Sequence, residues 1–496
     1  MCNSIDEWIN QSQNHGGSNH KSRVHIMNSN TPQNGQLEIS NNTQECPKSE
    51  IEKKILLGRN LCQIPSGSNY DSIIQFTHFD NSQISFSLTK EQLSMHLLLL
   101  GGIGTGKTNV FYWIVDALKK TLQKNDIMVI FDSKGDFYEK FRPMSNDIII
   151  GNGERYRSLS HVWNIYAEVM GKLPPKFFQN YRYKKEWDSN VREIIKTMFK
   201  SRKSEQQPFF ADAAADLVVN KMISVLRKGQ ISEMHTYKLK EFFSRSTIKD
   251  FDEYILDPDM NFSYAKQYYG DGTTPQALGV FGYINQMISD CFIGIFGDYQ
   301  SDKEFAMSEL VKQKGKRTLY VEYDLRTGEV LTPIYQLLYD QVLKEGLSRQ
   351  NDNEGSIYLV CDEMKLLGKV EHISDGLNFG RSMGMKIISG LQSVEQLFDI
   401  YGDHKANAIL SGFMNMFCFN ASDYTSRKYI SEHFGKNFVQ IPFFKDGGEK
   451  DYYQREGFVV EEWDIQRLRR GEAIIDIWKD PPSSPFKFRF SRYKTI

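Results

Sequence analysis

Short apolar runs recur along the chain and predict buried strands. They fall at residues 97–100, 127–131, 319–323, 357–361, 387–391, 414–419 and 473–477. Strands that are apolar on both faces are typical of a parallel sheet covered by helices. Segments with helical spacing, such as 109–122 and 335–347, stand between several of these runs. The pattern therefore predicts an α/β fold with a central, mostly parallel sheet, and the alternating apolar and basic residues of 486–490 predict an edge strand.

The middle of the chain follows a different pattern. Apolar residues recur at helical spacing in 217–226, 237–243 and 283–288, and no strand pattern interrupts them. We therefore predict an all-α domain of residues 166–290, inserted between the two parts of one nucleotide-binding domain, residues 51–165 and 291–496. Patterns typical of strands at 73–76 and 84–88 belong to the first part. Residues 1–50, rich in Asn, Ser, Gln and Gly, predict a disordered polar tail.

Composition narrows the class of protein. The chain has 496 residues, of which 40% are hydrophobic, enough for two or three domains with real cores. It carries 61 Lys and Arg against 62 Asp and Glu, so any contact with nucleic acid must be local. No apolar run approaches the roughly 20 residues that cross a bilayer, and the first residues do not resemble a signal peptide. The six cysteines form no metal-binding spacing, and we expect a cytoplasmic protein.

The residues between the apolar run 97–100 and the predicted helix 109–122 contain the candidate functional groups. Residues 101–108 read GGIGTGKT, which fits the phosphate-binding pattern GxxxxGK[ST]. Backbone N–H groups of such a loop surround phosphate oxygens, the Lys107 ammonium reaches the β- and γ-phosphates, and the Thr108 hydroxyl binds Mg²⁺. ATP and Mg²⁺ are thus the expected cofactors. The expected nucleotide contacts are Gly101, Gly102, Gly104, Thr105, Gly106, Lys107, Thr108 and Asn109.

Polar residues at the ends of later strands complete this site. Asp362 and Glu363 follow the run at 357–361, and we expect Asp362 to hold Mg²⁺ and Glu363 to polarise the attacking water. This interpretation assumes that their strand neighbours the strand of the phosphate loop. Asp132 ends another strand and is expected to face the nucleotide or the subunit interface, although it could instead belong to a polar turn. Gln392 could contact the γ-phosphate or the water, or be a surface residue.

Arg381 and the stretch of residues 171–210 each allow two interpretations. Arg381 lies in a Gly-flanked loop after the Asp-Glu pair, which we expect near the carboxyl edge of the sheet. It could be an arginine finger across a subunit boundary, although structural arginines are commoner. Residues 171–210 contain ten Lys and Arg and four Asp and Glu, and residues 181–185 read YRYKK. Such a stretch could follow DNA phosphates and stack on bases, or be a solvated helix face.

An ordered set of motifs resembles the coupling ATPases of conjugation and type IV secretion, the TraD/TraG-like family in the group of FtsK and HerA motors. The set spans about residues 90–475: HLLLLGGIGTGKT at 96–108, FDSKGD at 131–136, WN at 163–164 with Glu168, PFFADAA at 208–214, CDEM at 361–364, FGRSMG at 379–384, GLQS at 390–393, QL at 396–397 and YG at 401–402. Two features depart from the family pattern. The family usually has N-terminal membrane helices, whereas the sequence pattern here predicts none, and Ser133 stands where the family often has Pro.

The resemblance implies a RecA-like, homo-hexameric motor with an all-α domain at one mouth of its channel. It implies that Arg381 acts in the neighbouring subunit, that Gln392 senses the γ-phosphate, and that Arg427 enters the neighbour's site. The implied partners are single- or double-stranded DNA, a relaxase nucleoprotein or effector protein, and a secretion apparatus or separate membrane subunit that recruits the motor to the inner face of the membrane. Alternatives are a protein-moving or defence- or repair-associated ring ATPase, and a nucleotide-gated docking receptor.

Overall fold

The structure is a computed structural model that describes residues 54–63, 71–141, 143–176, 180–200, 206–445, 450–479 and 482–494. These residues belong to one compact unit, which runs from Glu52 to Ile496. The polar tail predicted for residues 1–50 lies outside the described residues.

A nine-stranded sheet forms the centre of this unit, in the order β16-β15-β12-β4-β11-β10-β5-β9-β6. The seven strands from β12 to β6 are parallel, and β15 and β16 add an antiparallel edge. The strands are β4 (Leu97–Leu100), β5 (Ile127–Asp132), β6 (Ile148–Gly151), β9 (Arg317–Glu322), β10 (Ile357–Cys361), β11 (Met385–Leu391), β12 (Asn415–Cys418), β15 (Glu472–Asp476) and β16 (Phe486–Arg489). The predicted parallel sheet and edge strand are confirmed.

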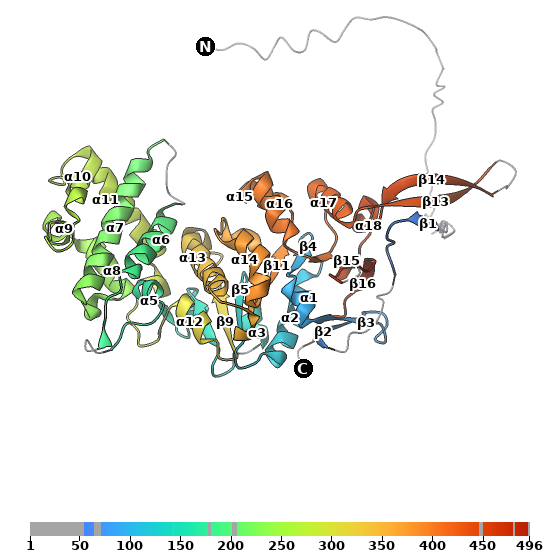
Figure 1. The fold of residues 1–496 in the computed structure, drawn as a ribbon, viewed down its shortest axis with the longest axis horizontal. Coiled ribbons are helices and arrows are strands. Elements are labelled where there is room, and N and C mark those ends of the chain that lie inside the picture. The colour runs from blue at the N-terminus through green and yellow to red at the C-terminus, as the bar shows by residue number, and fades with distance from the viewer. Residues whose placement is uncertain are drawn as a thin grey trace, which may run out of the picture. The chain divides into compact units, whose positions relative to one another are not determined.

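Helices cover both faces of the sheet, which explains the fully apolar strands (Figure 1). In β4, Leu98 and Leu100 belong to a core that includes Leu337 and Leu377, whereas Leu97 and Leu99 face a second core. The helices of this part are α1 (Lys90–Ser94), α2 (Lys107–Thr121), α3 (Asp136–Phe141), α4 (Glu154–Arg157), α12 (Met307–Gln313), α13 (Gly328–Leu347), α14 (Ile373–Phe379), α15 (Glu395–Tyr401), α16 (Asp403–Ser411), α17 (Tyr424–Phe434) and α18 (Glu462–Gln466).

The described residues between Ile165 and Cys291 form helices and no strand. The α-helices are α5 (Ile165–Met170), α6 (Glu186–Lys200), α7 (Pro208–Lys228), α8 (Thr236–Arg245), α9 (Ile248–Ile255), α10 (Lys266–Tyr269) and α11 (Pro275–Cys291). The helices α7 and α11 pack side by side (Figure 1). The domain boundaries at 166 and 290 stay a prediction. Among the helices of the described ranges, none combines the length and the apolar content that crossing a bilayer requires.

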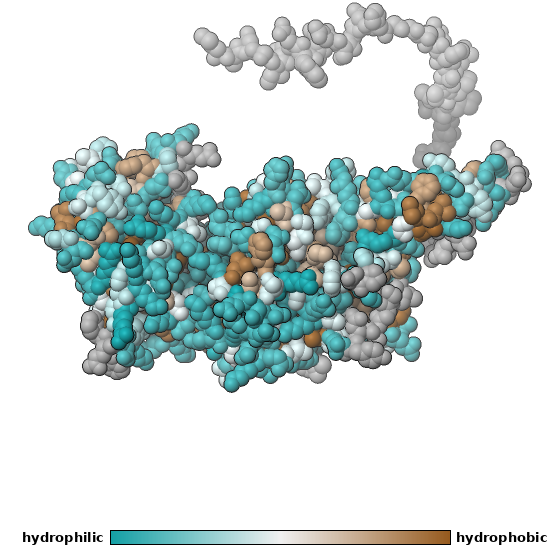
Figure 2. Space-filling view, in the orientation of Figure 1, coloured by the Kyte–Doolittle hydropathy of each residue, from teal (hydrophilic) through white to brown (hydrophobic). Residues whose placement is uncertain are grey.

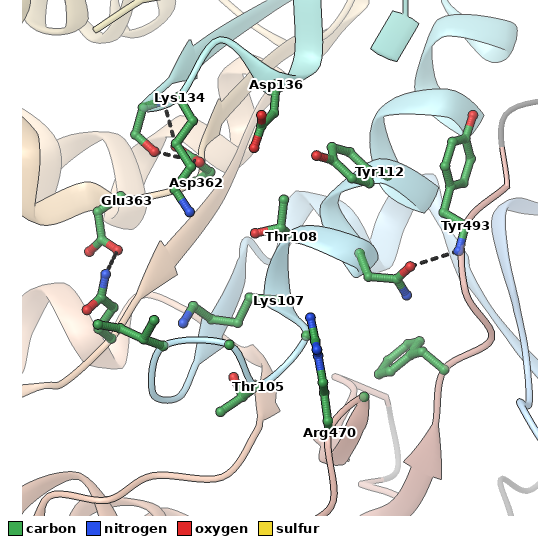
Figure 3. A pocket seen from close by; sticks show the side chains of 18 of the residues that line it. Thr105, Lys107, Thr108, Tyr112, Lys134, Asp136, Asp362, Glu363, Arg470 and Tyr493 are labelled. Atoms are coloured by element: carbon green, nitrogen blue, oxygen red, sulfur yellow. Dashed lines mark hydrogen bonds between the residues drawn. The ribbon is translucent and has the colours of Figure 1, made fainter. Parts of the chain in front are cut away.

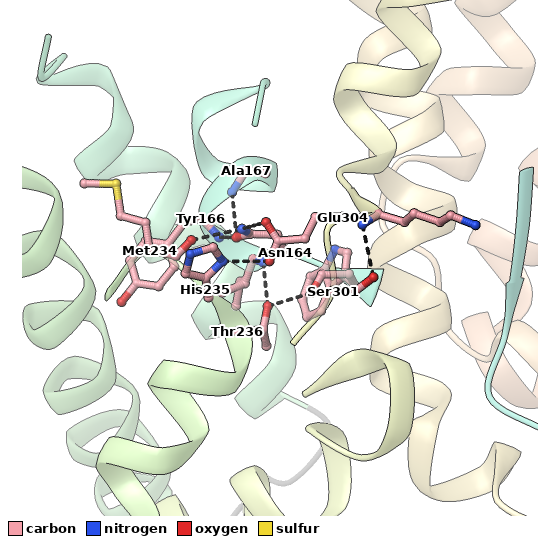
Figure 4. A network of polar contacts seen from close by, with 11 residues as sticks. Asn164, Tyr166, Ala167, Met234, His235, Thr236, Ser301 and Glu304 are labelled. Carbon is pink, nitrogen blue, oxygen red and sulfur yellow. Dashed lines mark hydrogen bonds and ion pairs between the residues drawn. The ribbon is translucent and has the colours of Figure 1, made fainter. Parts of the chain in front are cut away.

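A partly buried polar network joins these helices to the sheet where the chain enters and leaves them (Figure 4). The strands β7 (Val162–Trp163) and β8 (Glu304–Phe305) pair there in parallel. The Asn164 amide donates to Glu304 and to the Met234 carbonyl, each at 2.9 Å. His235 Nδ1 lies 2.7 Å from the other Glu304 oxygen. Because buried polar groups that are fully paired favour one arrangement, this network fixes how the helices leave the sheet.

Glu168, from the WN motif region, has a related structural role. Its carboxylate accepts hydrogen bonds from the backbone N–H groups of Met307 (2.7 Å) and Ser308 (2.8 Å) and from the Trp163 indole (3.1 Å). These contacts hold the start of α12 against α5. The motif residues Trp163, Asn164 and Glu168 therefore stabilise the connection between the helices and the sheet.

Several strands were absent from the prediction. β6 has only three apolar residues before Gly151, which is too short a run to recognise. The strands β13 (Lys436–Phe444) and β14 (Lys450–Phe458) form a hairpin that pairs with β1 (Lys54–Leu57), and β14 is largely charged or exposed. The pair β2 (Ser72–Thr77) and β3 (Ser85–Thr89) agrees with the sequence pattern. Figure 2 shows an apolar group over β1 and β13, where Leu57 is 74% exposed.

Candidate functional site

The ends of four parallel strands meet at one edge of the sheet. β4 leads into the phosphate loop, β5 ends at Asp132, β10 leads into Asp362 and Glu363, and β11 leads into Gln392. β11 lies between β4 and β10, so the expectation that the acids follow a strand next to β4 is wrong. This order places Gln392 between the phosphate loop and the acids, at the edge where ligands bind in open parallel sheets.

The phosphate loop has the backbone that its glycines permit. Gly104 and Gly106 have φ angles of 73° and 116°, and Gly106 leads directly into α2. A Cβ atom at Gly106 would lie 3.0 Å from the Cα atom of Gly471, a tight contact with backbone that adds to the strain of the positive φ angle. The ammonium of Lys107 donates to the carbonyls of Gly101 and Gly102, the second at 3.0 Å. Burial lowers the pKa of Lys107 below its ordinary value, and the negative charge of Glu363 offsets only part of this effect.

Asp362 and Glu363 differ in their surroundings. The Asp362 carboxylate accepts hydrogen bonds from the Ser133 backbone N–H (3.1 Å) and hydroxyl (2.8 Å). Burial, with a smaller effect of Asp132, raises the pKa of Asp362 to about 7. A neighbouring cation would oppose this effect, because it stabilises the ionised carboxylate.

Only one of the two Glu363 carboxylate oxygens pairs with Gln392, and the other is open in the sense that it can still accept a hydrogen bond. The Gln392 amide donates to Oε2 of Glu363, whereas Oε1 is buried and has no hydrogen-bond partner within the described ranges. Burial also raises the pKa of Glu363. A buried acceptor without a partner is costly unless a ligand or water completes it, so this oxygen fits a carboxylate that orients a water molecule.

Residues 103–108 of the loop, the acids and Gln392 line one side of a cavity of about 870 Å³ (Figure 3), whereas Gly101 and Gly102 do not line it. The Thr108 hydroxyl and the Asp362 carboxylate, which are expected to hold Mg²⁺, therefore face the same space, and Lys134 lines it as well. Tyr112, Arg470 and Tyr493 lie on the other side (Figure 3), and Arg492 lines the cavity too. The sequence did not indicate these four, because they belong to no motif and three of them lie more than 350 positions beyond the loop.

Asp132 does not line the cavity. Its carboxylate is 1% exposed and accepts hydrogen bonds from the backbone N–H groups of Lys134 (3.1 Å), Asp136 (3.2 Å) and Phe137 (2.9 Å). The expected nucleotide contact is therefore wrong, because the carboxylate is used to hold the turn into α3. Asn109 does line the cavity, but its amide bonds to the backbone of Ser491 and Tyr493.

We expect Asp132→Ala to lower the free energy of unfolding by about 1–3 kcal/mol, since it leaves buried N–H groups without their acceptor. The affinity for nucleotide should change much less than in a variant of the phosphate loop. Thermal unfolding and nucleotide titration of the same protein measure both effects. A stable Asp132→Ala protein that has lost nucleotide binding would restore the original interpretation.

Arg381 lies at the opposite edge of the sheet. It belongs to the 3₁₀ helix η7 (Gly380–Met383), which precedes β11, whereas Gln392 follows that strand. Seven strand residues separate the two by about 20 Å. The expected position of Arg381 near the carboxyl edge is therefore wrong. Its guanidinium is exposed and lies 5.6 Å from the ring centre of Trp478.

Arg427 already has partners in its own chain. Its guanidinium pairs with Glu462 at 3.3 Å and donates to the Ser422 carbonyl. These contacts join α17 to α18 and explain the residue without a neighbouring subunit.

Of the basic stretch 171–210, the structure describes residues 171–176, 180–200 and 206–210. Its tyrosines pack inward: the Tyr181 hydroxyl donates to the Leu226 carbonyl, and the Tyr183 hydroxyl donates to Asp188 at 2.6 Å. Arg182, Lys184 and Lys185 are exposed, and Lys184 pairs with Glu186. The stretch therefore offers charges to a partner, whereas its tyrosines are not positioned to stack on bases.

Comparisons with known proteins identify the family of this chain. A family model described as the type IV secretion-system coupling protein DNA-binding domain matches residues 81–488. The chain belongs to this family. The match includes the phosphate loop, the acids, Gln392 and the helices between Ile165 and Cys291.

Two curated relatives of this coupling-protein chain are similar over part of their length. The type IV secretion system-coupling protein VirD4 of Bartonella henselae is 19% identical over 324 residues, which cover 60% of this chain and 48% of VirD4. The coupling protein TraD of Escherichia coli K12 is 20% identical over 330 residues, which cover 64% of this chain and 40% of TraD. The chain thus spans about half or less of these relatives.

Solved structures of the conjugative coupling protein TrwB share the fold. The unbound form has a TM-score of 0.65 and 18% identity, with 90% of this chain and 95% of TrwB covered. A complex of TrwB with the ATP analogue ADPNP has a TM-score of 0.63 and 18% identity, covering 89% and 95%. A TrwB complex with ADP and Mg²⁺ also has a TM-score of 0.63, with 17% identity and coverage of 90% and 96%. The predicted RecA-like P-loop fold is therefore confirmed.

Proposed function

We propose that this chain is an ATP-hydrolysing motor that moves DNA for a conjugative or type IV secretion system. The observation that carries the proposal is the meeting of Lys107, Asp362, Glu363 and Gln392 at one cavity. The TrwB complexes with ADPNP and with ADP and Mg²⁺ support the same ligands here.

Each residue has a separate task in this proposal. The loop N–H groups and Lys107 bind the phosphates, and Thr108 and Asp362 hold Mg²⁺, which draws charge from the γ-phosphate. Glu363 accepts a hydrogen bond from the attacking water through its open oxygen. Gln392 fixes the Glu363 carboxylate and changes its contacts when the γ-phosphate is present, which would let it report the nucleotide state to β11.

A homo-hexameric ring completes the site. Arg381 is too far from its own phosphate loop to contact a bound nucleotide, and its exposed guanidinium supports a role in the neighbouring subunit. In the ring, the channel would pass the α-helical insertion, for which we propose residues 166–290. An arginine supplied by a neighbour makes hydrolysis depend on assembly.

The family description supports DNA as the substrate, and the relatives VirD4 and TraD support a secretion apparatus as the partner. We propose that the substrate is DNA alone or DNA bound to a relaxase, and that the motor works in the cytoplasm at the inner face of the membrane. ATP-dependent displacement of the third strand from a DNA triplex tests movement along DNA. Displacement without ATP, or none with ATP and Mg²⁺, would contradict the proposal.

A contribution of the basic stretch to DNA binding can be measured separately. Replacing Arg182, Lys184 and Lys185 together by Gln should weaken DNA binding and reduce the slope of its salt dependence by about 2–3 if all three contact phosphates. Fluorescence anisotropy with labelled DNA over a salt series measures both.

A matched control replaces three other exposed lysines by Gln. These are Lys120 near the end of α2, Lys124 before β5 and Lys316 before β9. This variant has the same change in net charge. Equal effects of the two triple variants would mean that only net charge matters and that residues 182–185 are a solvated surface.

A further inference from the structure

The turn before β15 is fixed against the phosphate loop. The backbone N–H of Gly471 donates to the Thr105 carbonyl at 2.8 Å, and the Gly471 carbonyl accepts from the Phe490 N–H at 2.8 Å. The Glu472 carboxylate accepts from the Arg469 N–H at 2.8 Å, which closes the turn. These contacts hold the backbone on both sides of Arg470, so its Cα atom has a defined place beside the loop.

The side chain of Arg470 is exposed and lines the same cavity as the loop. Figure 3 shows it pointing into the cavity on the far side of Lys107 from Glu363. No hydrogen bond or ion pair of its guanidinium occurs in the part of the chain that the structure describes. Arg489, which lines the cavity too, is instead paired with Asp80 at 3.0 Å and lies over Phe79.

Beyond Arg470, two tyrosines line the wall of the cavity, Tyr112 and Tyr493. The rings of Tyr112 and Tyr493 have their centres 5.9 Å apart, and the Asn109 amide holds the backbone of this C-terminal segment through Ser491 and Tyr493. A nucleotide whose γ-phosphate lies at Glu363 would extend its other end towards this wall. Arg470 would then stand beside the middle of the ligand, where the phosphate chain joins the nucleoside.

We propose that Arg470 binds the phosphate chain of the nucleotide within its own subunit, from the side opposite Asp362 and Glu363. A guanidinium is a planar donor that suits phosphate oxygens, and hydrogen bonds between charged groups are stronger than neutral ones. This inference rests on the proposed ATPase function and gives Arg470 a phosphate-binding role of its own beside Lys107. Lys107 contacts the phosphates that react, whereas Arg470 contacts those present in both ATP and ADP.

The test is a titration of Arg470→Ala with ATP and with ADP. The dissociation constants of both should rise by about tenfold and by similar factors, because both ligands keep the phosphates near the nucleoside. The turnover number at saturating ATP should stay within about twofold of wild type, since Arg470 does not contact the transferring group. Arg470→Lys should recover part of the affinity.

Arg469→Ala is the matched control, because Arg469 is the adjacent exposed arginine and does not line the cavity. It should bind both nucleotides like wild type. Equal affinities of the Arg469→Ala and Arg470→Ala proteins would overturn the inference while leaving the ATPase proposal intact. A lower turnover number with unchanged affinities would also overturn it. Wild-type protein that binds no ATP would instead contradict the proposed function itself. Thermal unfolding of each variant shows whether it is folded.

Discussion

Glu363→Gln is expected to bind ATP with near wild-type affinity and to hydrolyse it about 10²–10⁴-fold more slowly. The change keeps the size of the side chain and leaves Lys107, Thr108 and Asp362 in place. What it removes is the negative charge on the open oxygen, which would accept a hydrogen bond from the attacking water. The measurements are a nucleotide titration and a steady-state assay of phosphate release.

Lys107→Ala provides the contrast, because it removes the cation at the phosphates. This variant should lose both hydrolysis and most of its ATP affinity. The two variants together separate binding from the chemical step. Near wild-type turnover of Glu363→Gln would refute the role assigned to Glu363, and normal ATP binding by Lys107→Ala would refute the role of the loop.

Arg381→Ala is expected to bind ATP normally and to hydrolyse it about 10³–10⁵-fold more slowly, the range found when an arginine finger acts on the transferring phosphoryl group. The structure makes this prediction sharper than the sequence did. Because Arg381 lies at the edge of the sheet opposite Gln392, it cannot act on the nucleotide of its own subunit. Turnover per wild-type chain should therefore rise with protein concentration.

Mixing Arg381→Ala with Lys107→Ala tests the same point directly. Some interfaces of a mixed ring would combine an intact loop with an intact arginine, so activity should partly return. Arg381→Ala also removes the contact with Trp478, and thermal unfolding must show that the fold is retained. If exchanged mixtures stay inactive, and Arg381→Ala alone loses ATP binding or folding, the arginine is structural.

All strands of the central sheet except β6 could be predicted, because burial on both faces favours long apolar runs. Leu97–Leu100 and Ile357–Cys361 are fully buried, and no polar pattern obscures them. The hairpin of β13 and β14 could not be recognised in the same way, since its exposed faces carry charged residues. The order of the strands was also beyond the sequence, which is why the place of β11 between β4 and β10 was missed.

Local motifs predicted the part of the site that lies near strand ends, and long-range packing decided the rest. Lys107, Glu363 and Gln392 meet because their parallel strands end at one edge. Asp132 ends such a strand too, but the nearby N–H groups of its own turn take its carboxylate. Arg470 and Tyr493 reach the cavity through contacts between distant segments, for which the sequence has no periodic signal.

The rate of ATP hydrolysis by the wild-type chain, measured with and without DNA in the presence of Mg²⁺, tests the central claim most directly. We expect hydrolysis that DNA stimulates and that Glu363→Gln abolishes under the same conditions. ATP binding without turnover at any concentration of protein or DNA would contradict a motor and favour a nucleotide-gated receptor.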